Sequence, residues 1–160
     1  MADGISDIVK SASDAANSLL LDLWRFPSRT IGYSLGTISI MIGGVHKTIT
    51  YCSCGKQRKI DFYIGGIMRS SWGMTPSDST IFVGNEFYSM LLKNDIDAWD
   101  TLSHECGHTI QAEIFGPLYL PLVVPFTGWS YNFDYFNWAE SWATRLGERF
   151  ITFPDERISD

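Results

Sequence analysis

The stretch LSHECGHTIQ, residues 102–111, decides how the rest of the chain is interpreted. It contains the pattern HECGH, from His104 to His108. Residues four apart on an α-helix differ in direction by only about 40°, so the two imidazoles point the same way, one turn apart. Two histidines at this spacing can bind one Zn²⁺ ion, and Glu105 between them is placed to act as a general base. The alternative is an ordinary helix that happens to carry two histidines.

The flanking sequence predicts that HECGH lies inside a long helix. Asn94 or Asp95 is a suitable N-cap, and the acidic residues of the next turns are favoured there by the helix dipole. Gly116 and Pro117 end the helical pattern. The chain has three histidines, and two of them belong to HECGH. A metal site is therefore the favoured interpretation of the motif.

A catalytic zinc site needs a third protein ligand and an open position for water. Glu140 is the favoured ligand, because it lies on a later predicted helix whose tryptophans would pack that helix against the first. Glu113 lies about 140° around the helix from the second histidine and faces away. Glu148, two turns beyond Glu140, and Asp134, on an irregular segment, are the other candidates.

Four further residues are candidates for supporting roles. Asp100 and Gln111 lie on the same side of the motif helix as the histidines and are candidates to hold the imidazoles in place. Tyr131 and Tyr135 are candidate donors to the oxyanion of a tetrahedral intermediate, with core packing as the alternative role of each.

The composition is that of a folded globular chain. The 160 residues suit one domain, and 45% are apolar while only 19% are charged, which excludes a disordered protein. The net charge is −6, and no cluster of lysine and arginine is present. These features argue against nucleic acid and against an anionic membrane surface as partners.

The three cysteines, Cys52, Cys54 and Cys106, do not form a disulfide framework. Cys52 and Cys54 could chelate a soft metal, but free thiols in a turn are the favoured interpretation, which suits a reducing compartment. No signal peptide is visible, and the apolar stretches 31–45 and 114–126 are too short or too broken to span a bilayer. The cytoplasm is the default expectation, and export by a non-classical secretion system is the alternative.

The first half of the chain predicts helices followed by strands. Apolar spacing predicts an amphipathic helix over residues 5–24, inside an N-terminal segment 1–26 that Pro27 ends. Residues 28–42 fit a strand in part, but the flanking proline and glycines favour a helix. β-Branched and aromatic residues predict strands at 45–51 and 58–64, with CSCGKQ as the loop between them.

The second half of the chain completes an α+β pattern. Residues 65–79 are predicted to be a loop, and 80–83 a strand. After the motif helix come an apolar, proline-rich loop at 116–129, a helix at 138–150 and a polar tail at 152–160. The N-terminal helix and the 116–129 loop are the candidate surfaces for a protein partner.

HECGH followed by a glutamate on a later helix resembles the zincin metallopeptidases of the gluzincin type. The stretches LLLDLWRFPSRTIGYSLG, SHECGHTIQAEIFGPLYLPLVVP and ESWATRLG are similar to metallopeptidase-like domains of bacterial Rhs/YD-repeat polymorphic proteins. The resemblance implies one domain over 1–160 with a minimal zincin-like α+β fold: a small β-sheet, the motif helix and a following ligand-bearing helix. It implies that His104, His108 and Glu140 bind Zn²⁺ and that Glu105 is catalytic.

The resemblance also implies that residues 80–83 form the sheet edge that binds extended peptide. Thermolysin-like enzymes place an aspartate four residues after the glutamate ligand, and this chain has Thr144 there, so the support of the first histidine is not implied. The implied function is a zinc-dependent peptidase of the endopeptidase kind, acting on a peptide or protein, which in bacteria fits an effector or toxin domain. One alternative is a metal-binding interaction or assembly module with a vestigial site, and another is a hydrolase of non-peptide amides or esters.

Overall fold

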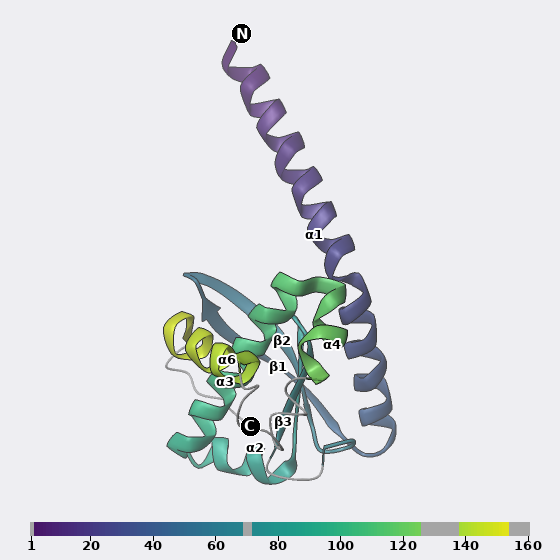
Figure 1. Cartoon of the computed structure of the whole chain (residues 1–160), viewed down its shortest axis with the longest axis vertical. Coiled ribbons are helices and arrows are strands. Elements are labelled where there is room, and N and C mark those ends of the chain that lie inside the picture. The colour runs from purple at the N-terminus through teal and green to yellow at the C-terminus, as the bar shows by residue number, and fades with distance from the viewer. Residues whose placement is uncertain (1, 69–71, 126–137, 154–160) are drawn as a thin grey trace.

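The computed structural model describes residues 2–68, 72–125 and 138–153. They form an α+β fold, as the sequence predicts, in which helices pack on both faces of one mixed sheet (Figure 1). The helices are α1 (Ala2–Met41), α2 (Asn85–Leu92), α3 (Ile96–Phe115), α4 (Tyr119–Leu122) and α6 (Trp138–Phe150). The strands are β1 (Val45–Ser53), β2 (Lys56–Ile64), β3 (Gly73–Ser77), β4 (Thr80–Val83) and β5 (Ile151–Thr152).

The strand order in the sheet is β3-β4-β2-β1-β5. β4 runs parallel to β2, and the other neighbouring pairs are antiparallel. β3 is therefore one edge of the sheet and β4 is an interior strand. The prediction that residues 80–83 form the edge is wrong, because it placed residues 65–79 in a loop. The sequence of β3, GMTPS, reads as a turn, but a proline is tolerated on an edge strand.

The β1–β2 hairpin is tighter than predicted. Cys52 pairs with Gln57 and Ser53 with Lys56, so most of the predicted CSCGKQ loop belongs to the two strands. The turn itself has two residues, Cys54 and Gly55, with φ angles of 51° and 74°. Positive φ at both central positions matches the right-handed twist of a hairpin, which is why two residues are sufficient.

Helix α1 is continuous through Pro27, so the predicted break at this residue is wrong. From Ser28 onward, small residues face the sheet and permit close packing. A Cβ on Gly32 would lie 2.4 Å from Thr80 Oγ1, and a Cβ on Gly36 would lie 2.3 Å from the Tyr63 ring. Since this packing stabilises the helix on the C-terminal side of the proline, it outweighs the local preference for a break.

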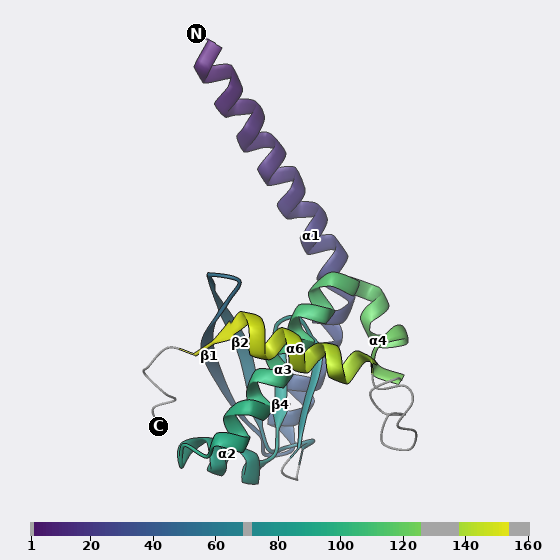
Figure 2. The same cartoon turned by 60° about the vertical axis from the view of Figure 1, so that its left-hand side comes forward.

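The first half of α1 projects from the body of the molecule (Figures 1 and 2). Residues 19–26, next to the body, include apolar side chains that face solvent. The exposed residues are Leu19, Leu20, Leu21, Leu23 and Phe26. No helix among the described residues has both the length and the apolar character needed to cross a membrane.

The main core lies between the other face of the sheet and helices α2, α3 and α6. Phe62 and Ile81 contribute from the sheet, Leu102 and Cys106 from α3, and Leu146 from α6. α2 is not predicted by the sequence analysis. A smaller cluster joins α4 to α3 and α6; its buried members are Ala112, Tyr119, Val123 and Ala139.

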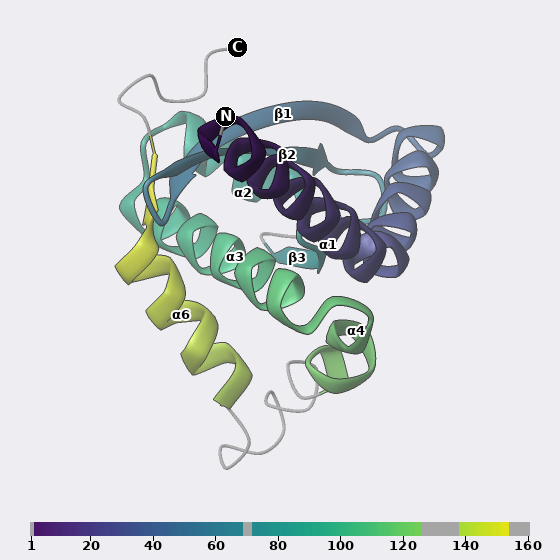
Figure 3. The same ribbon diagram turned by 90° about the horizontal axis from the view of Figure 1, so that it is seen from above.

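Helices α3 and α6 cross with their backbones in close contact, side by side in Figures 2 and 3. A Cβ on Gly107 would lie 2.0 Å from Ala143 O, and a Cβ on Gly147 would lie 2.4 Å from Ser103 O. Only glycine fits at these two positions. The crossing places the first turn of α6 beside the HECGH segment of α3.

Two predicted elements of the C-terminal half need correction. The first part of the predicted 116–129 loop is helical, with a 3₁₀ turn at Gly116–Leu118 followed by α4. The predicted tail at 152–160 begins inside β5, where Thr152 pairs with Cys52. The helix predicted at 138–150 is confirmed as α6. The aromatic segment 131–137, with Tyr131, Asp134 and Tyr135, lies outside the described residues.

Replacing Gly147 by alanine tests the close crossing. The added Cβ would push against a helix backbone, and overpacking of this kind costs about 1–3 kcal/mol, while the better helix propensity of alanine returns about 0.5–1 kcal/mol. We expect a net loss of stability in urea unfolding. Ser141→Ala, on the exposed side of α6, is the matched control and should change little. A Gly147→Ala protein as stable as the wild type would contradict the close backbone contact between α3 and α6.

Candidate metal centre

Helix α3 carries the motif as predicted. Asp95 is the N-cap, and its Oδ1 accepts a hydrogen bond of 3.1 Å from the backbone N–H of Ala98. Gly116 ends the helix with a φ of 52°, a conformation that glycine adopts readily. HECGH therefore lies in the middle of a helix that is capped at both ends, and its two histidines project from one side.

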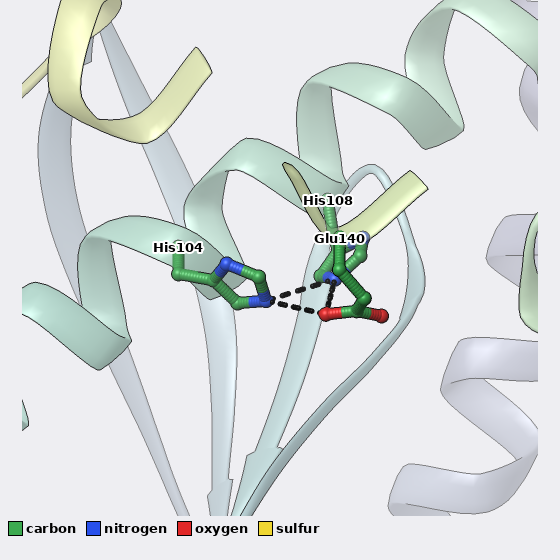
Figure 4. Close-up of side chains that lie close together, drawn as sticks. All are labelled: His104, His108 and Glu140. Carbon is green, nitrogen blue, oxygen red and sulfur yellow. Dashed lines mark hydrogen bonds and ion pairs between the residues drawn. The ribbon is translucent and has the colours of Figure 1, made fainter. Parts of the chain in front are cut away.

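His104, His108 and Glu140 come together between α3 and α6 (Figure 4). His104 Nε2 lies 3.2 Å from His108 Nε2 and 3.0 Å from Glu140 Oε2. His108 Nε2 lies 3.5 Å from the same carboxylate oxygen. Within the described part of the chain, this is the one group of three or more histidine, cysteine, aspartate or glutamate side chains close enough to share a metal ion.

These three distances fit a tetrahedral metal ion. Bonds of about 2.0–2.1 Å to zinc place neighbouring ligand atoms of a tetrahedron about 3.3 Å apart. The three ligand atoms are 3.0, 3.2 and 3.5 Å apart. Two imidazoles and one carboxylate also form a donor set that is typical of catalytic zinc sites. The residues present therefore fit the predicted ion.

The Nδ1 atom of His108 must carry a proton. It lies 2.8 Å from Gln111 Oε1, while Gln111 Nε2 donates to the backbone oxygen of Ala139 at 2.7 Å. The amide of Gln111 is oriented by that second bond, so its oxygen faces the imidazole and accepts from Nδ1–H. In neutral His108 the lone pair of Nε2 then points into the cluster. The predicted support by Gln111 is confirmed in position.

Thr144 supports His104 in a comparable way. Its Oγ1 lies 2.9 Å from His104 Nδ1 and donates to the backbone oxygen of Glu140 at 3.1 Å. A hydroxyl that donates to a carbonyl accepts from its other neighbour, so Nδ1 of His104 is the donor. Thr144, four residues after Glu140, is therefore the hydrogen-bond partner of His104. Asp100, the other predicted support, is exposed.

The three ligand atoms of the cluster need a positive charge between them, either a proton or a metal ion. Burial opposes ionisation of Glu140, but the ring nitrogens of His104 and His108 outweigh it and lower the pKa of Glu140 to about 2. Burial alone would lower the pKa of His108, but hydrogen bonding to Glu140 and the charge of Glu105 raise it overall. Two Nε2 lone pairs and a carboxylate this close repel one another unless a proton or a metal ion lies between them.

Glu105 lies beside the cluster but is not one of its three members. Its buried side chain points toward the edge strand β3, where Thr75 Oγ1 lies 2.6 Å from Oε2. A Cβ on Gly73 would lie 2.6 Å from Oε1, so the carboxylate rests against the strand backbone. Tyr119 of α4 donates to the backbone oxygen of Thr75 at 2.9 Å. The sequence did not predict a role for Gly73, Thr75 or Tyr119, because their contacts depend on strand β3, which was predicted to be a loop.

The other candidate ligands are not part of the site. Glu113 faces away from the cluster, as predicted, and pairs with Arg25 and Arg58. Glu148 is exposed on α6. Asp134 and the two candidate oxyanion donors lie outside the described residues.

The three cysteines are free thiols, as predicted. Cys106, the third residue of HECGH, is buried, and burial raises the pKa of its thiol strongly, so it stays protonated. Cys52 and Cys54 belong to no candidate metal cluster among the residues that the structure describes.

Comparisons of the chain with protein-family models, with curated proteins and with solved structures found no match. The resemblance to zincin metallopeptidases therefore stays a prediction.

Metal content tests the three ligands directly. We expect wild-type protein supplied with zinc to hold about one ion per chain, and His104→Ala and Glu140→Ala to lose it, because two remaining ligands bind too weakly. Inductively coupled plasma mass spectrometry after dialysis is the measurement. Glu148→Ala, on the same helix as Glu140, is the control and should retain the metal. Full occupancy in Glu140→Ala would exclude this residue as a ligand.

Replacing Thr144 by valine tests the support of His104. The variant keeps the shape of the side chain but loses the acceptor for Nδ1–H, and losing such an outer partner weakens metal binding by about 10–100-fold. Competition with a chromophoric chelator measures the change in zinc affinity. Thr144→Ser, which keeps the hydroxyl, should bind zinc nearly as the wild type does. Equal affinities of the valine and serine variants would show that the hydroxyl has no role.

Proposed function

We propose that the chain is a zinc-dependent peptidase, in which His104, His108 and Glu140 bind Zn²⁺ and Glu105 is the catalytic base. The observation that supports this most directly is the arrangement of four side chains. Three present ligand atoms at tetrahedral spacing, while the fourth, the carboxylate of Glu105, lies beside them and is bonded to Thr75 instead. A purely structural zinc site has no use for a carboxylate that lies beside the ion without binding it.

The bound zinc ion would lower the pKa of a water molecule and polarise the substrate carbonyl. Glu105 takes a proton from the attacking water while the water oxygen bonds to the carbonyl carbon. Glu105 then gives this proton to the leaving nitrogen as the C–N bond breaks, so that it ends in its starting state. Gln111 and Thr144 keep the imidazoles in the tautomer that directs Nε2 at the metal.

The edge strand β3 offers one backbone position, Gly73, to an extended peptide. Gly84 N–H donates to Trp72 O, which makes residues 72 and 84 a hydrogen-bonded pair of the antiparallel ladder. The next pair, Gly73 with Val83, is then a non-hydrogen-bonded pair, so the N–H and C=O of Gly73 face away from β4. These two groups lie next to Glu105. They could pair with the backbone of a peptide at the reacting bond.

The apolar surface of α1 supports a second candidate function. Leucines and a phenylalanine exposed on a projecting helix are typical of a surface that binds another protein. On this view the chain is a metal-binding interaction or assembly module without catalysis. The two functions differ in what they require of Glu105, because only catalysis depends on its carboxylate.

Replacing Glu105 by glutamine distinguishes the two functions. The substitution keeps the size of the side chain but removes the base, so we expect unchanged zinc content and a loss of peptide hydrolysis of at least about 100-fold. A quenched-fluorescent peptide library, read by mass spectrometry, is the assay for zinc-loaded protein. Glu113→Gln, a carboxylate on the same helix outside the site, is the control. Equal hydrolysis by wild type and Glu105→Gln would exclude the proposed base.

A further inference from the structure

Thr75 contacts Glu105 but has no role in the chemistry described above. Its Oγ1 lies 2.6 Å from Glu105 Oε2 and 3.2 Å from the backbone oxygen of the same residue. Both neighbours are acceptors, so the hydroxyl is the donor, and the closer carboxylate oxygen is the better partner. A hydroxyl–carboxylate bond of this length is charge-assisted and therefore strong. Both side chains are buried, which shields the bond from water.

Gly73 limits the position of the other carboxylate oxygen. A Cβ at this position would lie 2.6 Å from Oε1 and 2.8 Å from Cδ of Glu105. The missing side chain therefore leaves the space that the carboxylate occupies. Oε2 accepts a hydrogen bond from Thr75. Oε1 lies against the backbone of Gly73, whose N–H and C=O face away from β4.

Tyr119 fixes the part of β3 that carries Thr75. Its hydroxyl donates to Thr75 O, and its side chain is buried between α3 and the strand. Burial, followed by the charges of Glu105 and Glu140, raises the pKa of Tyr119 well above its usual value, so it remains a donor. The backbone of Thr75, from which its hydroxyl-bearing side chain projects, is thus held from outside the strand.

We propose that Thr75 is a positioning residue, which together with Gly73 fixes the carboxylate plane of Glu105 so that Oε2 is bound and Oε1 accepts the proton. This inference rests on the proposed function, since a carboxylate needs a fixed orientation here only if it transfers a proton. Without the hydroxyl, the carboxylate would rotate about its last bond. Proton transfer would then occur from a minority of orientations.

The contact itself is tested without metal or substrate. In urea unfolding of the metal-free protein, Thr75→Val should lower the transition midpoint in the wild-type background, and this shift should largely vanish in the Glu105→Ala background. Thr80→Val, a buried threonine on the neighbouring strand, should shift the midpoint equally in both backgrounds. If the shift from Thr75→Val were equal in both backgrounds, the hydroxyl would not act through the side chain of Glu105, and the proposal would be wrong.

The positioning role is tested with acetohydroxamate and zinc-loaded protein. A hydroxamate binds zinc through its oxygens and donates a hydrogen bond to a correctly oriented base. We expect calorimetry to show about tenfold weaker binding to Thr75→Val, at unchanged zinc content, since one charged hydrogen bond contributes this much. Thr75→Ser should restore the affinity, and Gly73→Ala should reduce it by displacing Oε1. Thr80→Val should bind as the wild type does.

The outcomes separate the two proposals. Unchanged affinity in both Thr75→Val and Gly73→Ala would overturn the positioning role and leave the peptidase proposal standing. Failure of zinc-loaded wild type to bind acetohydroxamate would contradict the peptidase proposal, and the positioning role would fail with it. The unfolding measurements would then still report whether the two side chains interact.

Discussion

The site depends on the close approach of α3 and α6. Gly107 and Gly147 let the two helix backbones touch, because a Cβ at either position would overlap the opposite backbone. Glu140 reaches the two histidines only from a helix at this distance. The same contact brings Thr144 to His104 and lets Gln111 reach the backbone of Ala139. One packing constraint thus sets the position of one proposed ligand and the orientation of both imidazoles.

The polar side chains of the site are held by two different elements, helix α6 and strand β3. Gln111 and Thr144 bind one partner in the α6 backbone and one imidazole, so the backbone of α6 determines the proton position on both rings. Glu105 is held from the opposite side, by β3. Since helix and strand act on different side chains, the proposed metal ligands and the proposed base can be perturbed separately. The histidines and the carboxylate of Glu105 thus have independent supports.

The parts of the site that depend on local spacing could be predicted from the sequence. His104, Glu105 and His108 follow from helix geometry, and Glu140 follows from its place on a second amphipathic helix. Contacts made through tertiary pairing could not be predicted. Strand β3 has the composition of a turn, so its contacts with Glu105 had no sequence signal. The continuity of α1 through Pro27 likewise depends on packing that a local pattern does not contain, although the α+β class was predictable from the order of the elements.

Beyond Gly73, the edge strand β3 offers no further backbone groups to another strand. Pro76 has no N–H to offer, and the carbonyl of Thr75 is already bonded to Tyr119. Thr75, Pro76 and Ser77 are buried as well. A strand from another copy could pair with Gly73 but could not continue along β3, so stacking of sheets edge to edge is blocked after one residue. At β3, the chain can therefore offer one pairing position for the proposed catalysis without offering a template for edge-to-edge stacking of sheets.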